Sequence, residues 1–399
     1  MFIGVVGKPS VGKSTFFKAA TLAEVDIANY PFTTIKPNHA VGFVKIKDAA
    51  VDFGKVSNPR EGYAANGFRF VPVDMMDVAG LVPGAHLGLG MGNQFLDDLR
   101  PADALIHVID VSGSVNEKGE SVAVGSYDPI NDIKFLEDEL DFWYLEIIKK
   151  GWDKFSRTMM AEKGSIRAAI AKQLSGLKVT EIQVETSLRE LKLEDKKLIE
   201  WTDDELMGLA RSLRKKTKPM VIAANKCDMP TAENNLRRIR EQFKDYMIIP
   251  SSAESELALR EAAKHNLIDY IPGEKDFRIL DEGKLSDKQK NALNFIRTNI
   301  LQKYGGTGVQ EIINHSIFDI LKYIAIFPGG VNKLEDSKGN CLPDCFLMPP
   351  GTTALDFAYR LHTDFGDNFI KAIDVRSKMP VGKDHKLKNL DILEIMAKK

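Results

Sequence analysis

Cysteine is scarce in this sequence, with three residues in a chain of 399. Cys341 and Cys345 stand four positions apart in "CLPDC", and no second pair is present that would complete a zinc site. We therefore expect structural or incidental cysteines. Free thiols persist in a reducing environment, so the sequence favours a cytoplasmic location.

Long apolar runs and a strong net charge are also missing. No stretch approaches the roughly 18–20 apolar residues that span a bilayer, so a membrane role has no support. The N-terminus, "MFIGVVGKPS", lacks the charged region and the cleavage site of a signal peptide. A net charge of -1 provides no global attraction to nucleic acid. An RNA partner would need a local patch, and nothing indicates specificity for DNA.

Apolar runs separated by helical patterns predict an α/β fold. The predicted strands lie at 2–6, 68–80, 102–112, 218–228 and 246–253. The first runs into a glycine-rich turn, and the third is apolar enough for a strand that is buried on both faces. Strands that alternate with helices are typical of a doubly wound, mostly parallel sheet, whose ligands bind at the carboxyl ends of the strands.

Between the third and fourth strands the pattern is helical. From about 128 to 216 we find no strand, and Ile133 and Leu136 begin a run with three-four spacing. Thr202 followed by Glu205 fits a capping box for a further helix. We expect a helical insertion, either a helical hairpin or a coiled coil. The predicted division is a first part of the α/β domain at 1–127, the insertion at 128–216, a second part with trailing helices at 217–318, and a small α+β module at 319–399.

The segment "GKPSVGKS" at residues 7–14 has the pattern Gly-x-x-x-x-Gly-Lys-Ser between a strand and a helix. Successive backbone amides of such a loop wrap a β-phosphate, and the helix start adds a favourable dipole. Lys13 would bridge the β- and γ-phosphates in a catalytic role, and the Ser14 hydroxyl would bind Mg²⁺. A chance glycine turn is the alternative, and the flanking elements argue against it. The predicted binding residues are Gly7, Lys8, Pro9, Ser10, Val11, Gly12, Lys13, Ser14 and Thr15.

Two further segments are expected to meet the metal ion and the terminal phosphate. "DVAG" follows the second strand, where Asp77 would reach Mg²⁺ directly or through water and Gly80 would offer its N–H to the γ-phosphate. "NYPFTTIKPN" at 29–38 lies where a first switch loop belongs. Of Thr33 and Thr34, we favour Thr34 as a metal ligand. Either segment alone could be an ordinary loop, and the position of both after the phosphate loop supports the functional interpretation.

"NKCD" at 225–228 ends the fourth strand and predicts a base-reading loop. Asp228 can accept two hydrogen bonds from N1–H and the 2-amino group of guanine. Adenine has no such donor pair and would leave the carboxylate unpaired, at a cost of ~1–3 kcal/mol. An Asn-Lys turn with a helix cap is the alternative, but "SSA" occupies the expected backing position after the next strand. The predicted residues are Asn225, Lys226, Asp228, Ser251, Ser252 and Ala253.

Together these motifs resemble the Obg-related GTPases and, within them, the YchF-like branch. The resemblance rests on "GKPSVGKSTFF", "NYPFTTIKPN", "DVAGLVPGAHLGLGMGNQFLDDLR", "NKCD" and "SSAES". The C-terminal "PPGTTALDFAYRLHTDFG" is similar to a TGS domain, the small module that threonyl-tRNA synthetases, these GTPases and the SpoT group share. The resemblance implies a P-loop GTPase domain, nucleotide hydrolysis, Mg²⁺, a cytoplasmic setting and a role linked to the ribosome or RNA.

The sequence departs from the family pattern at two places. YchF proteins tend to alter the base-reading motif and can prefer ATP, whereas this chain keeps "NKCD", which favours GTP. Many relatives carry asparagine where Ser10 stands here. That asparagine is associated with potassium-assisted hydrolysis, so a potassium requirement is in doubt.

The position after Gly80 often holds a glutamine that orients the attacking water, and here it is Leu81. The resemblance places the chain among GTPases with a hydrophobic residue there. Backbone groups, a metal ion, a partner or another side chain must then position the water. His86 and His107 are the candidates within the chain, although a histidine on an apolar strand is more often a core residue.

The sequence therefore predicts a GTP-hydrolysing switch that is slow without a partner. An ATPase of the same fold is one alternative, and an RNA- or ribosome-binding module with a structural nucleotide is another. The last residues hold a local excess of basic side chains, which is compatible with phosphate contacts and also common on solvated surfaces. These residues are Arg376, Lys378, Lys383, Lys386, Lys388, Lys398 and Lys399, against Asp384, Asp391 and Glu394.

Overall fold

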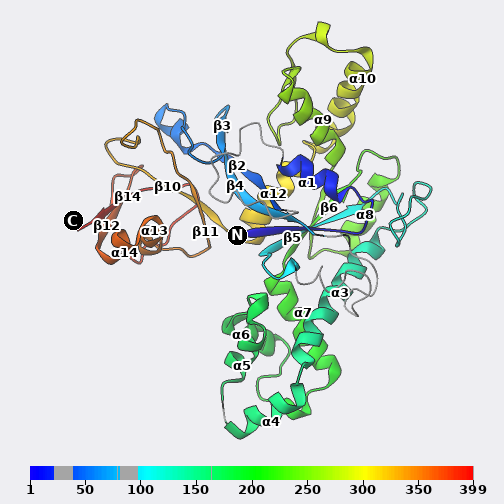
Figure 1. The fold of residues 1–399 in the computed structure, drawn as a ribbon, viewed down its shortest axis with the longest axis vertical. Helices are drawn as coiled ribbons and strands as arrows, with labels where there is room; N and C mark the ends of the chain where they lie inside the picture. Colours follow the sequence, from blue (N-terminus) through cyan, green and yellow to red (C-terminus); the bar gives the residue numbers. More distant parts are fainter. Residues whose placement is uncertain (22–38, 79, 81–97, 163, 399) are drawn as a thin grey trace.

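The computed structural model describes residues 1–21, 39–78, 80, 98–162 and 164–398. Figure 1 shows a central α/β domain, a helical part that projects from one end of it, and a second sheet at the side where the chain ends. Within the described residues, no helix is both long and apolar enough to cross a bilayer.

The central sheet is mostly parallel, as the apolar runs predict. Its strands follow the order β2-β4-β1-β5-β6-β7, and β3 pairs with β4. The pairs from β4 to β7 are parallel, whereas β2 and β3 run antiparallel to β4. The bounds are β1 Phe2–Val6, β2 His39–Lys47, β3 Tyr63–Ala65, β4 Phe68–Asp77, β5 Ala104–Asp110, β6 Met220–Asn225 and β7 Met247–Pro250.

Alternate residues of the central strands enter cores on opposite faces of this sheet. In β5, Ile106 and Val108 join one core, while Leu105 and Ile109 join the cores on the other face. Every residue of β5 and of β6 is buried, which explains their continuous apolar sequences. The helices of this part of the α/β domain are α1 Lys13–Thr21, α8 Ala232–Gln242 and α9 Ala253–Lys264.

The inserted helices form a bundle whose core continues onto one face of the central sheet, where Val6 of β1 and Leu105 of β5 join it. Shorter helices pack against α3 and α7 around Trp143, Trp152 and Trp201. The predicted capping box of Thr202 and Glu205 is present and starts α7. The bounds are α3 Ile130–Lys149, α4 Trp152–Glu162, α5 Ile166–Gln173, α6 Glu181–Glu190 and α7 Asp203–Thr217.

After α9 the chain is mainly helical, as expected, with a small hairpin that the sequence reading missed. The strands β8 Ile268–Asp269 and β9 Arg278–Ile279 pair antiparallel. The helices are α10 Asp287–Ile296, α11 Gln302–Tyr304 and α12 Val309–His315, with π-helical turns at Arg297–Leu301 and Ser316–Ile320.

The C-terminal part is a separate mixed sheet covered by two short helices. Its strands follow the order β11-β10-β14-β12-β13. The bounds are β10 Ile324–Pro328, β11 Phe346–Met348, α13 Ala354–Leu361, α14 Thr363–Asp367, β12 Phe369–Asp374, β13 Pro380–Val381 and β14 Ile392–Ala397. Buried Arg69 of β4 joins the central sheet to the connection between β10 and β11 by donating to the carbonyl oxygens of Leu342 and Pro343.

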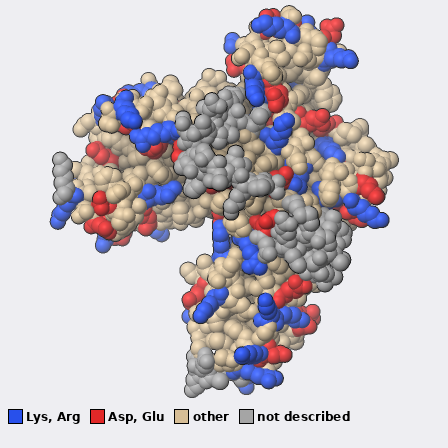
Figure 2. Space-filling model, in the orientation of Figure 1, with Lys and Arg blue, Asp and Glu red and all other residues tan. Residues whose placement is uncertain are grey.

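Charges of both signs are interspersed over the face shown in Figure 2, including the insertion and the C-terminal sheet. This distribution agrees with the net charge of -1. On this face, charge does not mark one broad docking surface.

Candidate functional site

The glycine-rich loop lies where β1 ends and α1 begins, at the carboxyl edge of the sheet. Gly12 has a φ of 91°, and a Cβ there would lie 2.3 Å from Asn225 Nδ2. A Cβ on Gly7 would lie 2.4 Å from the carbonyl oxygen of Val108. Side chains at either position would collide, so glycine allows the loop to pack against β5 and the end of β6. Ser10 also has a positive φ, of 65°.

The proposed metal-binding groups of the loop and of β4 converge. Lys13 forms an ion pair with Asp77, and the Ser14 hydroxyl donates to the same carboxylate at 3.3 Å. A hydroxyl and a carboxylate are the hard oxygen donors that Mg²⁺ takes alongside phosphate oxygens. Gly80 lies against Pro9 of the loop, so close that a Cβ placed on Gly80 would be 3.1 Å from Pro9 Cγ. Thr34 lies outside the described residues.

Asn225 connects the phosphate loop to the backing loop. Its Nδ2 donates to the Val11 carbonyl at 2.9 Å, and its Oδ1 accepts from the Ala253 N–H at 3.0 Å. The loop 225–228 and the backing loop 251–253 are also joined directly, since the Cys227 N–H donates to the Ser251 carbonyl at 3.1 Å. One buried amide thus fixes three segments that the sequence assigned to a single site.

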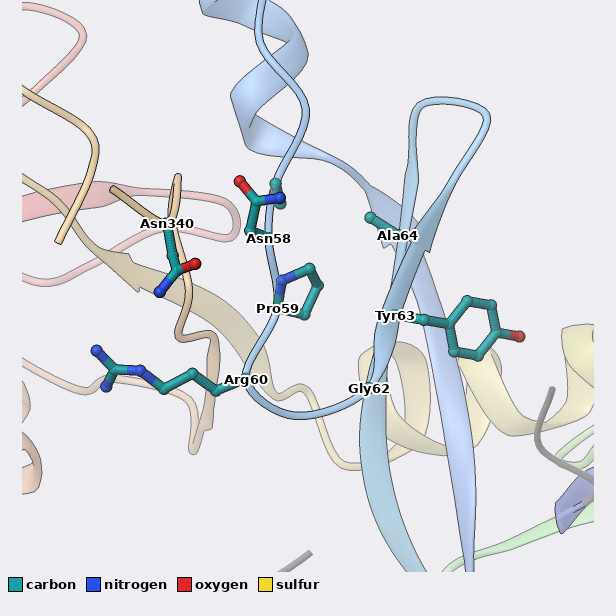
Figure 3. A pocket seen from close by; sticks show the side chains of 8 residues that line it. Asn58, Pro59, Arg60, Gly62, Tyr63, Ala64 and Asn340 are labelled. Atoms are coloured by element: carbon teal, nitrogen blue, oxygen red, sulfur yellow. The ribbon is translucent and has the colours of Figure 1, made fainter. Parts of the chain in front are cut away.

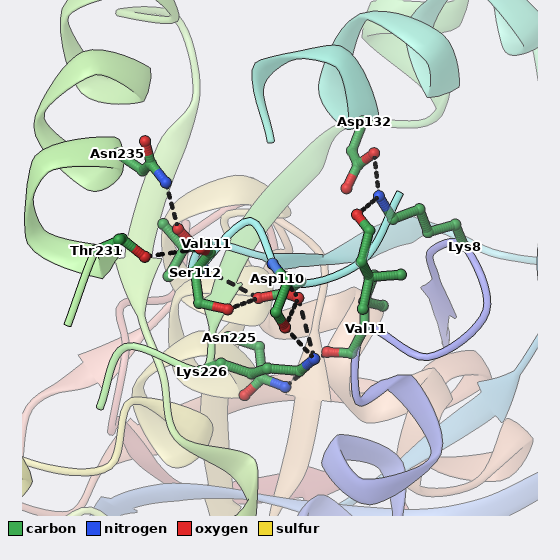
Figure 4. Close-up of polar contacts among 12 residues, drawn as sticks. Lys8, Val11, Asp110, Val111, Ser112, Asp132, Asn225, Lys226, Thr231 and Asn235 are labelled. Carbon is green, nitrogen blue, oxygen red and sulfur yellow. Dashed lines mark hydrogen bonds and ion pairs between the residues drawn. The ribbon is translucent and has the colours of Figure 1, made fainter. Parts of the chain in front are cut away.

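Lys226 is held by a buried carboxylate at the end of β5. Its Nζ lies 3.0 Å from Asp110 Oδ2 and 3.3 Å from the Ser114 hydroxyl (Figure 4). Burial opposes ionisation of Asp110, but hydrogen bonds from Ser112, Ser114 and Lys226 outweigh it and lower its pKa. The sequence reading missed Asp110, although its place at the carboxyl end of a buried strand is a usable signal.

Asp228 is half-buried and is not tied to the rest of the protein. It forms no hydrogen bond or ion pair with any other residue that the structure describes. The neighbouring Ser252 hydroxyl, by contrast, is engaged with the Ser255 hydroxyl at 2.8 Å. The Asp228 carboxylate therefore keeps its acceptor capacity for a ligand.

Lys8 points away from the phosphate loop into a buried polar cluster. Its ammonium contacts Asp132 of α3 (Figure 4) and the Val115 carbonyl, each at 2.8 Å. It also lies 3.8 Å from the centre of the Tyr127 ring. Burial lowers the pKa of Lys8 and raises that of Asp132. The Lys8 side chain thus joins the loop to the insertion, a role that sequence reasoning missed.

Of the two candidate histidines, the structure describes only His107. His107 is 2 % exposed within β5, and burial lowers its pKa to about 3, so it is neutral. This burial favours the interpretation of His107 as a core residue. His86 and Leu81 lie outside the described residues.

A cavity of about 360 Å³ lies away from this site, against the C-terminal part. Asn58, Arg60, Tyr63 and Asn340 are among its lining residues (Figure 3). None of its lining residues belongs to the predicted nucleotide site. Arg60 is already paired with two carboxylates, those of Asp336 and Asp344.

Comparisons with known proteins agree with this geometry. Residues 2–134 match the family model "50S ribosome-binding GTPase", residues 223–330 match "Obg-like GTPase YGR210-like, G4 motif-containing domain", and residues 337–397 match the TGS domain. A GTP-binding protein of Methanocaldococcus jannaschii is 47% identical over 396 residues, which cover 99% of this chain and 98% of the relative.

More distant and structural comparisons give the same family. The crystal structure of a GTP binding protein from Pyrococcus horikoshii OT3 is 39% identical, has a TM-score of 0.78 and covers 100% of both chains. The protein named ribosome-binding ATPase YchF of Bacillus subtilis is 28% identical, with 92% of this chain and 87% of the relative covered. The chain therefore belongs to the YchF-like branch of the Obg-related P-loop GTPases, with a C-terminal TGS domain.

Proposed function

We propose that this protein is a Mg²⁺-dependent switch that binds and hydrolyses GTP. The observation that carries the proposal is the carboxylate of Asp228, which bonds to no other residue in the described part of the chain. It lies in the same loop as Asn225, and Asn225 bonds to both the phosphate loop and the backing loop. This arrangement offers acceptors for guanine at a fixed distance from the phosphate-binding amides. The GTP-binding relatives and the matched GTPase family support it.

In this proposal each group of the site has a separate task. The amides of the phosphate loop hold the β-phosphate, and Lys13 bridges the β- and γ-phosphates. Ser14, Asp77 and Thr34 would hold Mg²⁺, which would supply positive charge to the phosphate oxygens. Asp110 holds the ammonium of Lys226, so that the aliphatic stem of this lysine can lie over the base.

The attacking water requires a group that positions it. Leu81 can neither donate nor accept a hydrogen bond, and burial keeps His107 neutral inside the sheet. His86 and the backbone at Gly80 remain the candidates within the chain. We propose slow hydrolysis by the isolated protein, with a partner or a further group completing the site.

The remaining parts would transmit the nucleotide state. We propose that residues 1–127 and 217–318 bind nucleotide, and that the insertion at 128–216 and the module at 319–399 contact the partner. The name of the Bacillus subtilis relative and the ribosome-binding family model support a ribosomal or RNA partner in the cytoplasm. Co-sedimentation with ribosomal subunits in the GTP and GDP states tests this part.

Titration calorimetry with GDP and ADP tests the base assignment. We expect GDP to bind at least about tenfold more tightly, and Asp228→Asn to remove that preference, because the lost pair of acceptors is worth ~1–3 kcal/mol. Asp245→Asn is a matched control, because the side chain of Asp245 is 88% exposed and Asp245 is not one of the proposed site residues. Equal or tighter binding of ADP by the native protein would refute guanine specificity.

An ATPase of the same fold is the second candidate, because the relatives from Bacillus subtilis and from human are named ATPases. The same titration separates the two. If phosphate release stays at background with ribosomes and potassium present, a binding module with a structural nucleotide becomes the better account.

A further inference from the structure

A short segment downstream of the nucleotide motifs packs against the loops 225–228 and 251–253, which we call the base-reading loops of the proposed site. We call it the 304–308 segment, after its residues "YGGTG". The Tyr304 hydroxyl donates to the carbonyl oxygen of Cys227 at 3.1 Å. The Ser252 N–H donates to the Thr307 carbonyl at 2.9 Å. One segment therefore contacts the loop 225–228 and the loop 251–253.

The contact with the second loop is tight enough to require glycine. Gly308 has a φ of 81°, and a Cβ there would lie 2.1 Å from the carbonyl oxygen of Pro250 and 3.0 Å from Ser251 Cα. Any side chain would push the backbone that leads into the loop 251–253. The 304–308 segment and this loop consequently pack as one body.

A buried carboxylate anchors the segment from the other side. Thr307 Oγ1 donates to Glu256 Oε2 at 2.6 Å, and the Tyr270 hydroxyl donates to the same oxygen at 2.7 Å. Arg260 Nε donates to Glu256 Oε1 at 2.8 Å and balances its charge. Glu256 is 0% exposed and lies in the first turn of α9, three residues after Ala253. Its hydrogen bonds are fully engaged, which favours one fixed arrangement.

The contact with the first loop depends on a neutral tyrosine. Burial raises the pKa of Tyr304, so its hydroxyl keeps the proton that it donates to Cys227. Cys227 lies between Lys226 and Asp228, the two residues expected to meet the base. Loss of the Tyr304 hydroxyl would leave this carbonyl without that donor and remove one of the contacts that hold the loop.

We propose that the 304–308 segment, anchored on Glu256, holds the two base-reading loops at the spacing that guanine requires. Tyr304 and Thr307 are then positioning residues that determine selectivity among purines without touching the nucleotide. This inference rests on the proposed recognition of guanine by Asp228. Two hydrogen bonds to one base edge need the acceptor atoms to lie within about 0.5 Å of their ideal positions. A loosened loop should therefore lose its preference for guanine before it loses affinity for nucleotides in general.

The test compares Tyr304→Phe and Thr307→Val with the native protein. Each variant removes one hydroxyl. Their matched controls are Tyr359→Phe and Thr298→Val, which remove hydroxyls that bond to Asp367 and Asn294, away from the base-reading loops. Calorimetry measures the affinity of each full-length protein for GDP, for IDP, which lacks the 2-amino group, and for ADP. Thermal unfolding shows that each variant is folded at the temperature used.

We expect the ratio of GDP to IDP affinity to fall about fivefold in both variants, the loss of roughly one hydrogen bond, with unchanged ratios in the controls. Affinity for ADP should change less than affinity for GDP. A purely structural role would weaken all three nucleotides equally or lower only the unfolding temperature, and either result would overturn the inference. Native protein without a preference for GDP would overturn the proposed guanine recognition together with it, whereas a native preference that both variants keep would overturn the inference alone.

Discussion

The buried ion pair between the phosphate loop and the insertion makes a large and measurable contribution to stability. Lys8 Nζ lies 2.8 Å from Asp132 Oδ1, and the two side chains are 3% and 5% exposed. Asp132→Leu leaves the ammonium with the Val115 carbonyl and the Tyr127 ring alone. Breaking a buried pair in this way costs about 3–5 kcal/mol. We expect the free energy of unfolding to fall by that amount.

The opposite substitution should cost less, for a reason visible in the cluster. In Lys8→Met, Asp132 keeps the hydrogen bond from the Tyr127 hydroxyl, at 2.9 Å. Burial raises the pKa of Asp132, so the carboxyl can take up a proton once the lysine is gone. We expect a loss of about 1–3 kcal/mol. The double variant, with Lys8→Met and Asp132→Leu, replaces the pair by apolar groups and should lie within about 2 kcal/mol of the native protein.

Urea unfolding followed by tryptophan fluorescence measures these values. The three tryptophans of the chain, Trp143, Trp152 and Trp201, all lie in the core of the insertion and report on its unfolding. Lys178→Met is the control, because its pair with Asp103 lies on the surface and should contribute less than about 1 kcal/mol. A loss below about 1 kcal/mol in Asp132→Leu, or single losses that simply add in the double variant, would refute the reasoning.

Three further predictions concern residues around the same sheet. Burial lowers the pKa of His107 to about 3, whereas a histidine in the unfolded chain has a pKa near 6.5. The free energy of unfolding should therefore fall by up to about 1.4 kcal/mol for each pH unit below 6.5. Urea titrations at pH 4–7 should show that His107→Leu flattens this dependence. Asp110→Asn should weaken GDP binding in calorimetry about three- to tenfold, since it removes the charge that holds Lys226; unchanged affinity would contradict that role. Arg69→Met should lower the free energy of unfolding by about 2–4 kcal/mol and speed proteolysis between the two sheets, because the carbonyl oxygens of Leu342 and Pro343 lose their donor. If the variant resists protease as well as the native protein does, Arg69 does not hold the two parts together.

The parts of the site that the sequence predicted are those whose functional residues stand close together in one short motif. "GKPSVGKS" and "NKCD" each follow a buried strand, and the carboxyl ends of parallel strands meet at one edge of a sheet. The convergence of Lys13 with Asp77, and of Asn225 with Val11 and Ala253, follows from that rule. The family assignment rests on the same contiguous motifs.

The contacts that the sequence could not predict join residues far apart in the chain. Lys8 with Asp132, Arg69 with Leu342, and Tyr304 with Cys227 have no local pattern, because each depends on where tertiary packing brings two segments together. Strand β2 was missed for a different reason. Gly42 interrupts its apolar alternation, and a Cβ there would lie 2.3 Å from Sδ of Met75 on the neighbouring strand, so a side chain would require Met75 to move.

A crystal structure with Mg²⁺ and a non-hydrolysable GTP analogue tests the central claim most directly. The account predicts that the triphosphate lies along the amides of Gly7 to Gly12, and that the Asp228 carboxylate accepts from N1–H and the 2-amino group while Lys226 covers the ring. An analogue bound elsewhere, or an Asp228 side chain turned away from the base in the occupied site, would contradict it.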